Sequence, residues 1–434
     1  MSLVQRMVIR NKFLPFFAAS VAVFVGSLLI AIGILLVYKF VNGDVSGPME
    51  FVRHYLFSDF SQMVYLALTD NPYDSNGFST IYLPLNLLLL YPFALICKSC
   101  PVFHSLDNYY GDAEERYVQT LEYNSAVLGT WQFWVSFVLY AIIHLALIAI
   151  VLYKMRQWGN VGEFACAFGA LLFSSFIIVG LVRGTNVLQT LLLSLIFVWL
   201  YRHPNKFYRE LALLCLAAAG TMKFYPLLLG ALLIREKRYW ESVRVGLYFL
   251  VLSLLPFVIF GDIISALKFY VANVYEFVNL NGKVGTCVNF SVYSVFQYFF
   301  SLFGLRRSLI ARIISIIAIV VTAVFCITCA LLTKSRFASL TVVCCGMMLI
   351  TPVSYYYVSM FFVIPLVYFI DEWKGFDKLR KWLYGIFFCF FAFLPLSVTA
   401  WYIPQCFIML VILVVEFRSV VKDRFKVTAC TGDN

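Results

Sequence analysis

Charged residues are scarce in this sequence. Asp, Glu, Lys and Arg make up only 13% of the 434 residues, whereas hydrophobic residues make up 62%. An ordinary soluble domain has about 25% charged residues. A chain with so little charge and so many long apolar runs is expected to be an integral membrane protein.

Several motifs of nucleotide and hydrolytic chemistry are missing. The sequence contains no P-loop, no G-x-S-x-G turn, no H-E-x-x-H helix and no Cys/His cluster with metal-ligand spacing. Water-soluble nucleotide chemistry therefore has no visible site. Internal repeats, Gly/Ser linkers and low-complexity segments are also absent, so a single membrane domain over residues 1–434 is the simplest organisation.

Apolar runs alternate with short basic clusters along the chain. The first run, 14–38, exceeds the roughly 20 residues that a spanning helix needs and lacks a small-residue cleavage site, so we expect an uncleaved span. The net charge is +11, and its clustering between apolar runs is typical of cytoplasmic loops rather than of a nucleic-acid-binding surface. This pattern predicts twelve spans, with both termini in the cytoplasm. The other predicted spans are 131–153, 161–180, 187–201, 210–221, 225–234, 243–260, 308–332, 337–351, 357–371, 381–396 and 402–417.

Residues 41–130 have the opposite charge bias. They carry ten acidic and three basic residues, which predicts a first extracytoplasmic loop. Within it, 81–97 is apolar enough to span, but a crossing would put the acidic residues that follow in the cytoplasm. Pro84 and Pro92 also disfavour a straight crossing. We therefore predict a helix in the outer interface at 81–97 and a second large extracytoplasmic loop at 261–307. Another helix is predicted at 58–69, because "DFSQMVYLAL" puts Asp59, Met63 and Leu66 on one helical face.

A few polar residues near the membrane are candidates for chemistry. Asp59 lies at the start of the predicted helix 58–69, where exposed N–H groups and the helix dipole favour a carboxylate. It is either a helix cap or a functional group, because ionisable residues at membrane depth commonly serve function. Asp70 and Asp74, in "TDNPYDSNG", have the composition of a turn.

Bases on the predicted outer side form a second set of candidates. Lys223, in "TMKFYP", lies between two short predicted spans and either binds a phosphate at headgroup level or extends towards water. Arg183, in "LVRGTN", breaks the charge rule and suggests an anionic partner, either a substrate or a lipid headgroup. His54, beside Arg53, is either a solvated surface histidine or a catalytic one.

Four stretches in order resemble glycosyltransferase family 87, the polyprenol-phosphate-dependent mannosyltransferases of the GT-C superfamily. Residues 59–95 resemble the family's D-F-x-x-Y-Y-x-A opening and the Y-P-P-L run that follows, and the other three resemble its K-x-x-P turn, N-x-S element and S-P-x-S-W-x-H segment. Tyr355 and Tyr357 stand where the family has Trp and commonly His. The other stretches are "AAAGTMKFYPLLLGALLIREKRYW" (217–240), "CVNFSVYSVF" (287–296) and "MLITPVSYYYVSMFFVIPL" (348–366).

The resemblance implies an all-α polytopic GT-C fold and an inverting hexosyltransferase. Its donor is a polyprenyl-phosphate-linked sugar, assigned as mannose by the family majority, and its acceptor is a hydroxyl of a lipid-linked or cell-envelope glycan. Transfer is expected on the extracytoplasmic face of the plasma (inner) membrane, without metal or cofactor, because the donor is already activated. Asp59 would be the general base. Lys223, Arg183 and Arg53 would bind the donor phosphate. The residues expected to bind the substrate are Asn289, Ser291, Ser354, Tyr357 and His54.

Three other functions remain open from the sequence. A secondary transporter would be expected to show internal repeats and paired broken helices, whereas the one broken hairpin, 210–234, has no counterpart. A lipid-linked oligosaccharide polymerase or ligase also acts on polyprenyl carriers, but would rely more on arginine in a large late loop. A non-enzymatic scaffold is the remaining alternative if Asp59 is only a helix cap.

Overall fold

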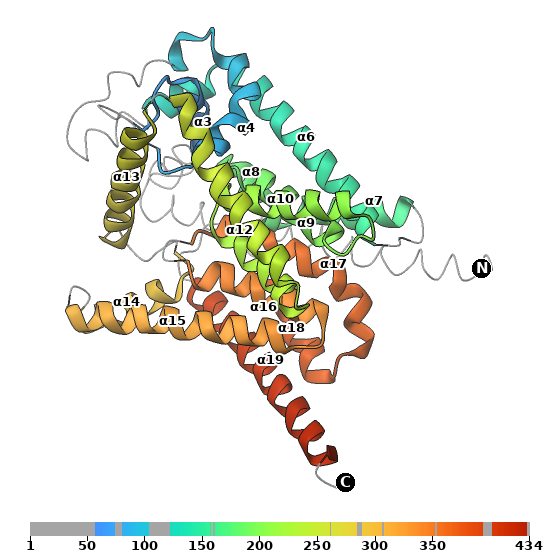
Figure 1. Ribbon diagram of the computed structural model, residues 1–434. Coiled ribbons are helices and arrows are strands. Elements are labelled where there is room, and N and C mark those ends of the chain that lie inside the picture. Colours follow the sequence, from blue (N-terminus) through green and yellow to red (C-terminus); the bar gives the residue numbers. More distant parts are fainter. Residues whose placement is uncertain are drawn as a thin grey trace, which may run out of the picture. The chain divides into compact units, whose positions relative to one another are not determined.

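A computed structural model gives the architecture of most of the chain, and helices are the only regular secondary structure in the described residues (Figure 1). The predicted first span 14–38 lies outside these residues, as do Arg53, His54 and Asp74. The structure describes residues 57–73, 80–103, 122–156, 158, 161–260, 262–283, 289–305, 308–351, 354–393 and 402–431.

The chain divides into two compact units. Unit 1 comprises Met1–Phe173, Ile177–Phe224 and Gly246–Leu280, and unit 2 comprises Ser174–Phe176, Tyr225–Val245 and Asn281–Asn434. Helix α12 (Tyr239–Leu254) contributes to both units.

In unit 1, α3 packs on α4, α4 packs on α6, and α9 packs on both α6 and α10. The helices that lie wholly or mostly in this unit are α3 (Ser58–Leu68), α4 (Pro84–Ala94), η1 (Leu95–Cys97), α6 (Trp131–Met155), α7 (Val161–Leu172), α8 (Ser175–Arg183), α9 (Val187–Leu200), α10 (Lys206–Met222), η4 (Leu255–Phe260) and α13 (Ile263–Lys283).

Aromatic packing fixes the start of α3 against α6. The Phe57 ring lies 4.7 Å from that of Phe137, and the Phe60 ring lies 5.8 Å from Phe133 and 5.2 Å from Tyr140. Phe60, Phe133 and Tyr140 are fully buried. Edge-on and tilted aromatic pairs of this kind add to the free energy of area burial, so the first turn of α3 has a well-defined position in unit 1.

In unit 2, α16 forms the core. Its side chains from Phe337 to Leu349 are all buried, and it packs against α15, α17, α19, η3 and η6; α14 lies along α15 (Figure 1). The other helices of unit 2 are η3 (Tyr225–Gly230), α11 (Ala231–Arg235), α14 (Val292–Leu302), α15 (Leu309–Leu332), α16 (Arg336–Leu349), η6 (Tyr356–Phe362), α17 (Val363–Glu372), η7 (Trp373–Gly375), α18 (Lys378–Phe393) and α19 (Tyr402–Thr431).

Within the described residues, four helical segments are long and apolar enough to cross a membrane: α6, Tyr239–Phe260, α15 and Pro404–Lys422. The predicted span 161–180 is instead broken into α7 and α8, which bend by 54° and together would make a fifth. Helices α9 and α16 have 14 residues each, about 21 Å at 1.5 Å per residue and short of a 30 Å hydrocarbon core. Twelve crossings therefore remain a prediction.

The two helices predicted in the first loop are confirmed as helices. The first is α3, and the second is α4 continued by η1. Pro84 lies at the first helical position, where the fixed φ of proline suits a helix start. The segment Pro84–Cys97 is among the shorter apolar helices rather than the candidate spans, and its position in the membrane interface remains a prediction.

Candidate active site

Asp59 lies in the first turn of α3 but is not its N-cap. The capping position belongs to Phe57, whose backbone is left-handed with φ 56°, and no side chain caps the helix. The Asp59 carboxylate instead accepts a hydrogen bond from Arg183 Nη2 at 2.8 Å. The two side chains are 13% and 27% exposed, so solvent reaches this ion pair only in part.

The end of α8 brings Arg183 to Asp59. The Phe57 N–H donates to the Val182 carbonyl at 2.7 Å, which joins the two helix ends through the backbone. Helix α8 stops at Gly184, which has φ +65° and whose N–H donates to the Gly180 carbonyl at 3.0 Å. A left-handed glycine is a common helix terminator. Arg183 thus occupies the last turn of α8, where the helix dipole favours a cation.

Gly184 also allows the close approach of α8 to α3. A Cβ at this position would lie 2.6 Å from Phe60 Cβ. We expect Gly184→Ala to lower the free energy of unfolding by about 1–3 kcal/mol, because the new methyl group adds overpacking to the cost of a left-handed residue. Gly304→Ala is the control, since Gly304 has φ +69° and nothing within 4 Å of its Cβ position. Equal melting temperatures of the two variants in detergent would contradict the close-approach argument.

Lys223 brings a second cation to the pair. It follows the last residue of α10 in extended conformation, and its Nζ lies 4.6 Å from the centroid of the Tyr82 ring. Burial lowers the pKa of Lys223 to about 8, opposed by the charge of Asp59 and reinforced by that of Arg183. The ends of three helices therefore gather one carboxylate and two cations, an arrangement that attracts an anion.

The buried side-chain amides of Asn186 and Asn86 are hydrogen-bonded to each other, and Asn186 follows Arg183 closely in the sequence. Asn186, three residues after Arg183, donates through Nδ2 to Asn86 Oδ1 at 2.9 Å, and Asn86 Nδ2 lies 3.7 Å from Met63 Sδ. This contact links α9, α4 and α3. The buried Oδ1 of Asn186 and Oε1 of Gln189 have no hydrogen-bond partner among the described residues. Asn186 and Gln189 both belong to the stretch "GTNVLQ" (184–189).

In unit 2, two of the recognised motifs are bonded to each other. Asn289 Oδ1 accepts hydrogen bonds from the backbone N–H of Ser291 at 3.1 Å and of Ser354 at 2.9 Å. The Phe290 N–H donates to the Ser354 carbonyl at 2.7 Å. Ser291 caps α14 through its hydroxyl. Stretches more than sixty residues apart thus form one polar junction.

Tyr357 lies three residues beyond this junction, in η6. It is 8% exposed, and its ring lies 5.6 Å from that of Tyr355. Of the predicted site residues, the structure brings together Asp59, Arg183 and Lys223 in unit 1, and Asn289, Ser291 and Ser354 in unit 2. Arg53 and His54 lie outside the described residues.

Comparison with known proteins decides the family. The model of glycosyltransferase family 87 matches residues 124–352, more than half of the chain. The chain belongs to glycosyltransferase family 87. Searches of curated proteins and of solved structures found no match.

Family 87 membership confirms the family identified from the motifs, and the protein is a membrane glycosyltransferase that acts on a sugar donor and an acceptor. Membership also implies the GT-C membrane fold. It favours this enzyme class over the secondary transporter and the scaffold. The matched region contains Arg183, Lys223, Asn289 and Ser291, whereas Asp59 precedes it.

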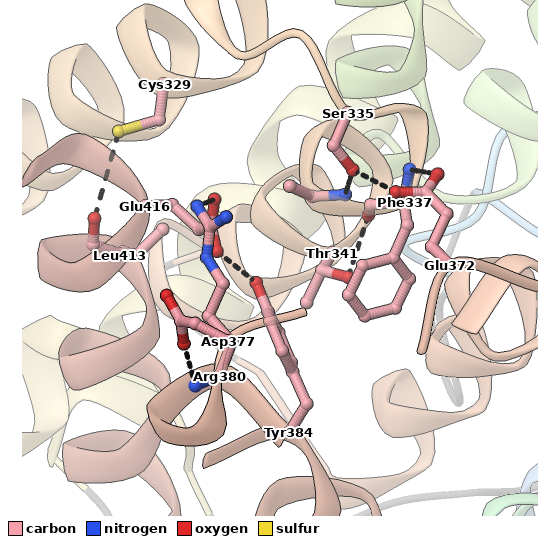
Figure 2. Close-up of polar contacts among 11 residues, drawn as sticks. Cys329, Ser335, Phe337, Thr341, Glu372, Asp377, Arg380, Tyr384, Leu413 and Glu416 are labelled. Atoms are coloured by element: carbon pink, nitrogen blue, oxygen red, sulfur yellow. Dashed lines mark hydrogen bonds and ion pairs between the residues drawn. The ribbon is translucent and has the colours of Figure 1, made fainter. Parts of the chain in front are cut away.

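A buried acidic residue in unit 2 of this glycosyltransferase had not been predicted as important. Glu416, 1% exposed in α19, accepts hydrogen bonds from Arg380 Nη2 and Tyr384 OH of α18, each at 2.8 Å (Figure 2). Its sequence signal is a single acid within the apolar run 402–417. The contacts join α18 to α19.

Proposed function

We propose that this glycosyltransferase transfers a hexose, mannose by family resemblance, from a polyprenyl-phosphate donor to a hydroxyl of a lipid-linked or cell-envelope glycan. Transfer inverts the anomeric carbon and occurs on the extracytoplasmic face of the plasma membrane. The observation that carries the proposal is the meeting of the Asp59 carboxylate with the cations of Arg183 and Lys223.

Asp59 is the general base of the proposed reaction. It takes the proton of the acceptor hydroxyl as the hydroxyl oxygen forms a bond to the anomeric carbon. The bond from that carbon to the phosphate oxygen breaks, and polyprenyl phosphate leaves with the electron pair. The hydrogen bond from Arg183 orients the carboxylate.

Arg183 and Lys223 stabilise the leaving phosphate. Negative charge develops on the phosphate as the sugar departs, and fixed cations in a partly desolvated site stabilise that charge. Arg183 presents a planar fork suited to phosphate, and Lys223 a compact ammonium. Arg53, only six residues before Asp59 in the sequence, is a third proposed phosphate ligand.

Substrate binding is assigned to the polar junction of unit 2. Asn289, Ser291, Ser354 and Tyr357 are proposed to contact the acceptor or the sugar, together with His54. Ser354 Oγ is buried without a hydrogen-bond partner among the described residues, which supports a role for it in binding a hydroxyl-rich ligand.

The proposed organisation is one GT-C membrane domain over residues 1–434 with about twelve crossings. Both termini lie in the cytoplasm, and the loops 41–130 and 261–307 lie outside. Helices α3 and α4 would lie in the outer interface, where the polyprenyl tail of the donor is available.

A transfer assay tests the proposal. Purified protein in lipid nanodiscs is given polyprenyl phosphate carrying radiolabelled mannose, with a membrane lipid extract as acceptor, and parallel reactions contain polyprenyl-phosphate glucose or a nucleotide-linked mannose. We expect label in a new product from the mannosyl lipid alone, with inverted anomeric configuration by NMR. Transfer from the nucleotide sugar, or no transfer from any lipid donor, would overturn the proposal.

A further inference from the structure

Tyr82 is an aromatic residue of unit 1 that lies outside the proposed catalytic and binding residues. It precedes α4 in the "IYLPLN" stretch, and the ammonium of Lys223 lies 4.6 Å from its ring centroid. An aromatic face attracts a cation that lies within about 6 Å of the ring centroid, and this distance is shorter. Lys223 reaches the ring from the end of α10, so the contact joins two chain segments that are distant in sequence.

The segment that carries Tyr82 is held in place by its neighbours. Its N–H donates to Thr80 Oγ1 at 3.0 Å, and its carbonyl accepts from the Tyr73 hydroxyl at 2.9 Å. Tyr73 is fully buried, with its ring 5.0 Å from that of Phe257. Asn273 of α13 donates to the carbonyls of both Tyr73 and Thr80. The backbone at Tyr82 is therefore fixed by the interior of unit 1.

We propose that Tyr82 is a positioning residue for glycosyl transfer, whose ring holds the ammonium of Lys223 in the direction of the donor phosphate. This inference rests on the proposed function, because the phosphate is the anion that Lys223 would meet. A lysine stem has four flexible carbons, and an aromatic face that attracts its charged end reduces the orientations open to it. Donor binding then loses less conformational entropy of the Lys223 side chain.

The charges around Lys223 make the contact measurable by pH. Burial lowers the Lys223 pKa to about 8, and Asp59 of α3 and Arg183 of α8 act on it in opposite directions. Helix α9, packed along α10, carries no ionisable side chain, and Tyr91, the ionisable residue of α4, is exposed. Because the Tyr82 ring favours the charged form, its loss should lower the pKa further.

Kinetics of Tyr82 variants provide the first test. Tyr82→Phe keeps the ring, whereas Tyr82→Leu and Tyr82→Met remove it with different shapes. For the parent and Tyr82→Phe we expect kcat/KM for polyprenyl-phosphate mannose to fall above about pH 8. For both ring-free variants we expect a donor KM higher by about fivefold, a fall that begins at lower pH, and a kcat at saturating donor close to that of the parent. Lys223→Arg should remove the alkaline fall, because a guanidinium stays charged.

A titration that needs no activity separates this inference from the proposed function. Lysines are labelled by reductive ¹³C-methylation, and the Lys223 signal, identified by its loss in Lys223→Arg, is followed by NMR in the parent and Tyr82 variants. A lower Lys223 pKa in Tyr82→Leu and Tyr82→Met, but not in Tyr82→Phe, supports the contact even if the parent transfers no sugar. An unchanged pKa and donor KM in the ring-free variants, or equal impairment of Tyr82→Phe, would overturn the inference.

Discussion

Asp59→Asn is expected to lower the kcat of sugar transfer by about 10³-fold, within the range that a general base contributes. The amide has the size of the carboxylate and keeps an oxygen that can accept the Arg183 hydrogen bond, but it cannot take the proton of the acceptor hydroxyl. The KM for the donor should change little, since the phosphate is assigned to the cations. Initial rates of transfer from radiolabelled polyprenyl-phosphate mannose measure the effect.

Asp70→Asn is the matched control for this variant. Asp70 is exposed in the bend that follows α3, so the same chemical change removes one charge from the same short segment without touching the ion pair. We expect the parent rate and melting temperature from Asp70→Asn, and from Asp59→Asn only a small fall in melting temperature, because the amide oxygen still accepts the Arg183 hydrogen bond. Asp59→Asn activity within about tenfold of the parent would remove Asp59 from the role of base.

The sequence predicted the local features of this site. Helix 58–69 followed from the periodicity of its side chains and the helix within 81–97 from apolar composition, charge bias and proline positions, and the structure has helices at both places. The family followed from motifs that occur in the family's order along the chain, each short enough to be recognised without tertiary information. The prediction of a carboxylate at the start of a helix was also correct for Asp59.

Contacts between residues far apart in the chain could not be predicted from the sequence. Asp59 and Arg183 are 124 residues apart, and their pairing depends on a backbone contact and a left-handed glycine that composition does not reveal. Phe57, rather than Asp59, takes the capping position, with a left-handed backbone and its N–H bonded to the Val182 carbonyl of α8. The Tyr82 contact depends in the same way on a loop whose position is set by packing.

Hydropathy does not distinguish a membrane span from a buried helix where apolarity has two possible causes. Helix α16 is apolar because its side chains are buried in unit 2, and this burial gives the same hydropathy as exposure to lipid. Hydropathy also did not detect the break between α7 and α8, since the residues on both sides are apolar. The length of an apolar run therefore predicted a helix, but not whether that helix crosses the membrane or is broken.

Glu416 illustrates what a buried charge contributes to such a chain. Its carboxylate is 1% exposed and is matched by Arg380, which is 23% exposed, and by the buried hydroxyl of Tyr384 (Figure 2). Removing one partner of a buried ion pair is costly because the other charge and its hydrogen-bonding groups remain without a partner. Replacing the whole set by apolar residues of similar size is often nearly neutral.

Glu416→Leu is accordingly expected to lower the free energy of unfolding by about 3 kcal/mol, at the lower end of the range for buried pairs because Arg380 is partly solvated. The triple variant Glu416→Leu, Arg380→Met, Tyr384→Phe should recover most of this loss, since no polar group is then left unpaired. Denaturant unfolding in detergent micelles measures both. Asp377→Asn is the control, because the exposed Asp377 carboxylate accepts the Arg380 N–H at the start of α18 and an asparagine oxygen can accept it too, so the change should cost about 1 kcal/mol or less. A triple variant no more stable than Glu416→Leu would show that the charges themselves, rather than their mutual satisfaction, hold α18 to α19.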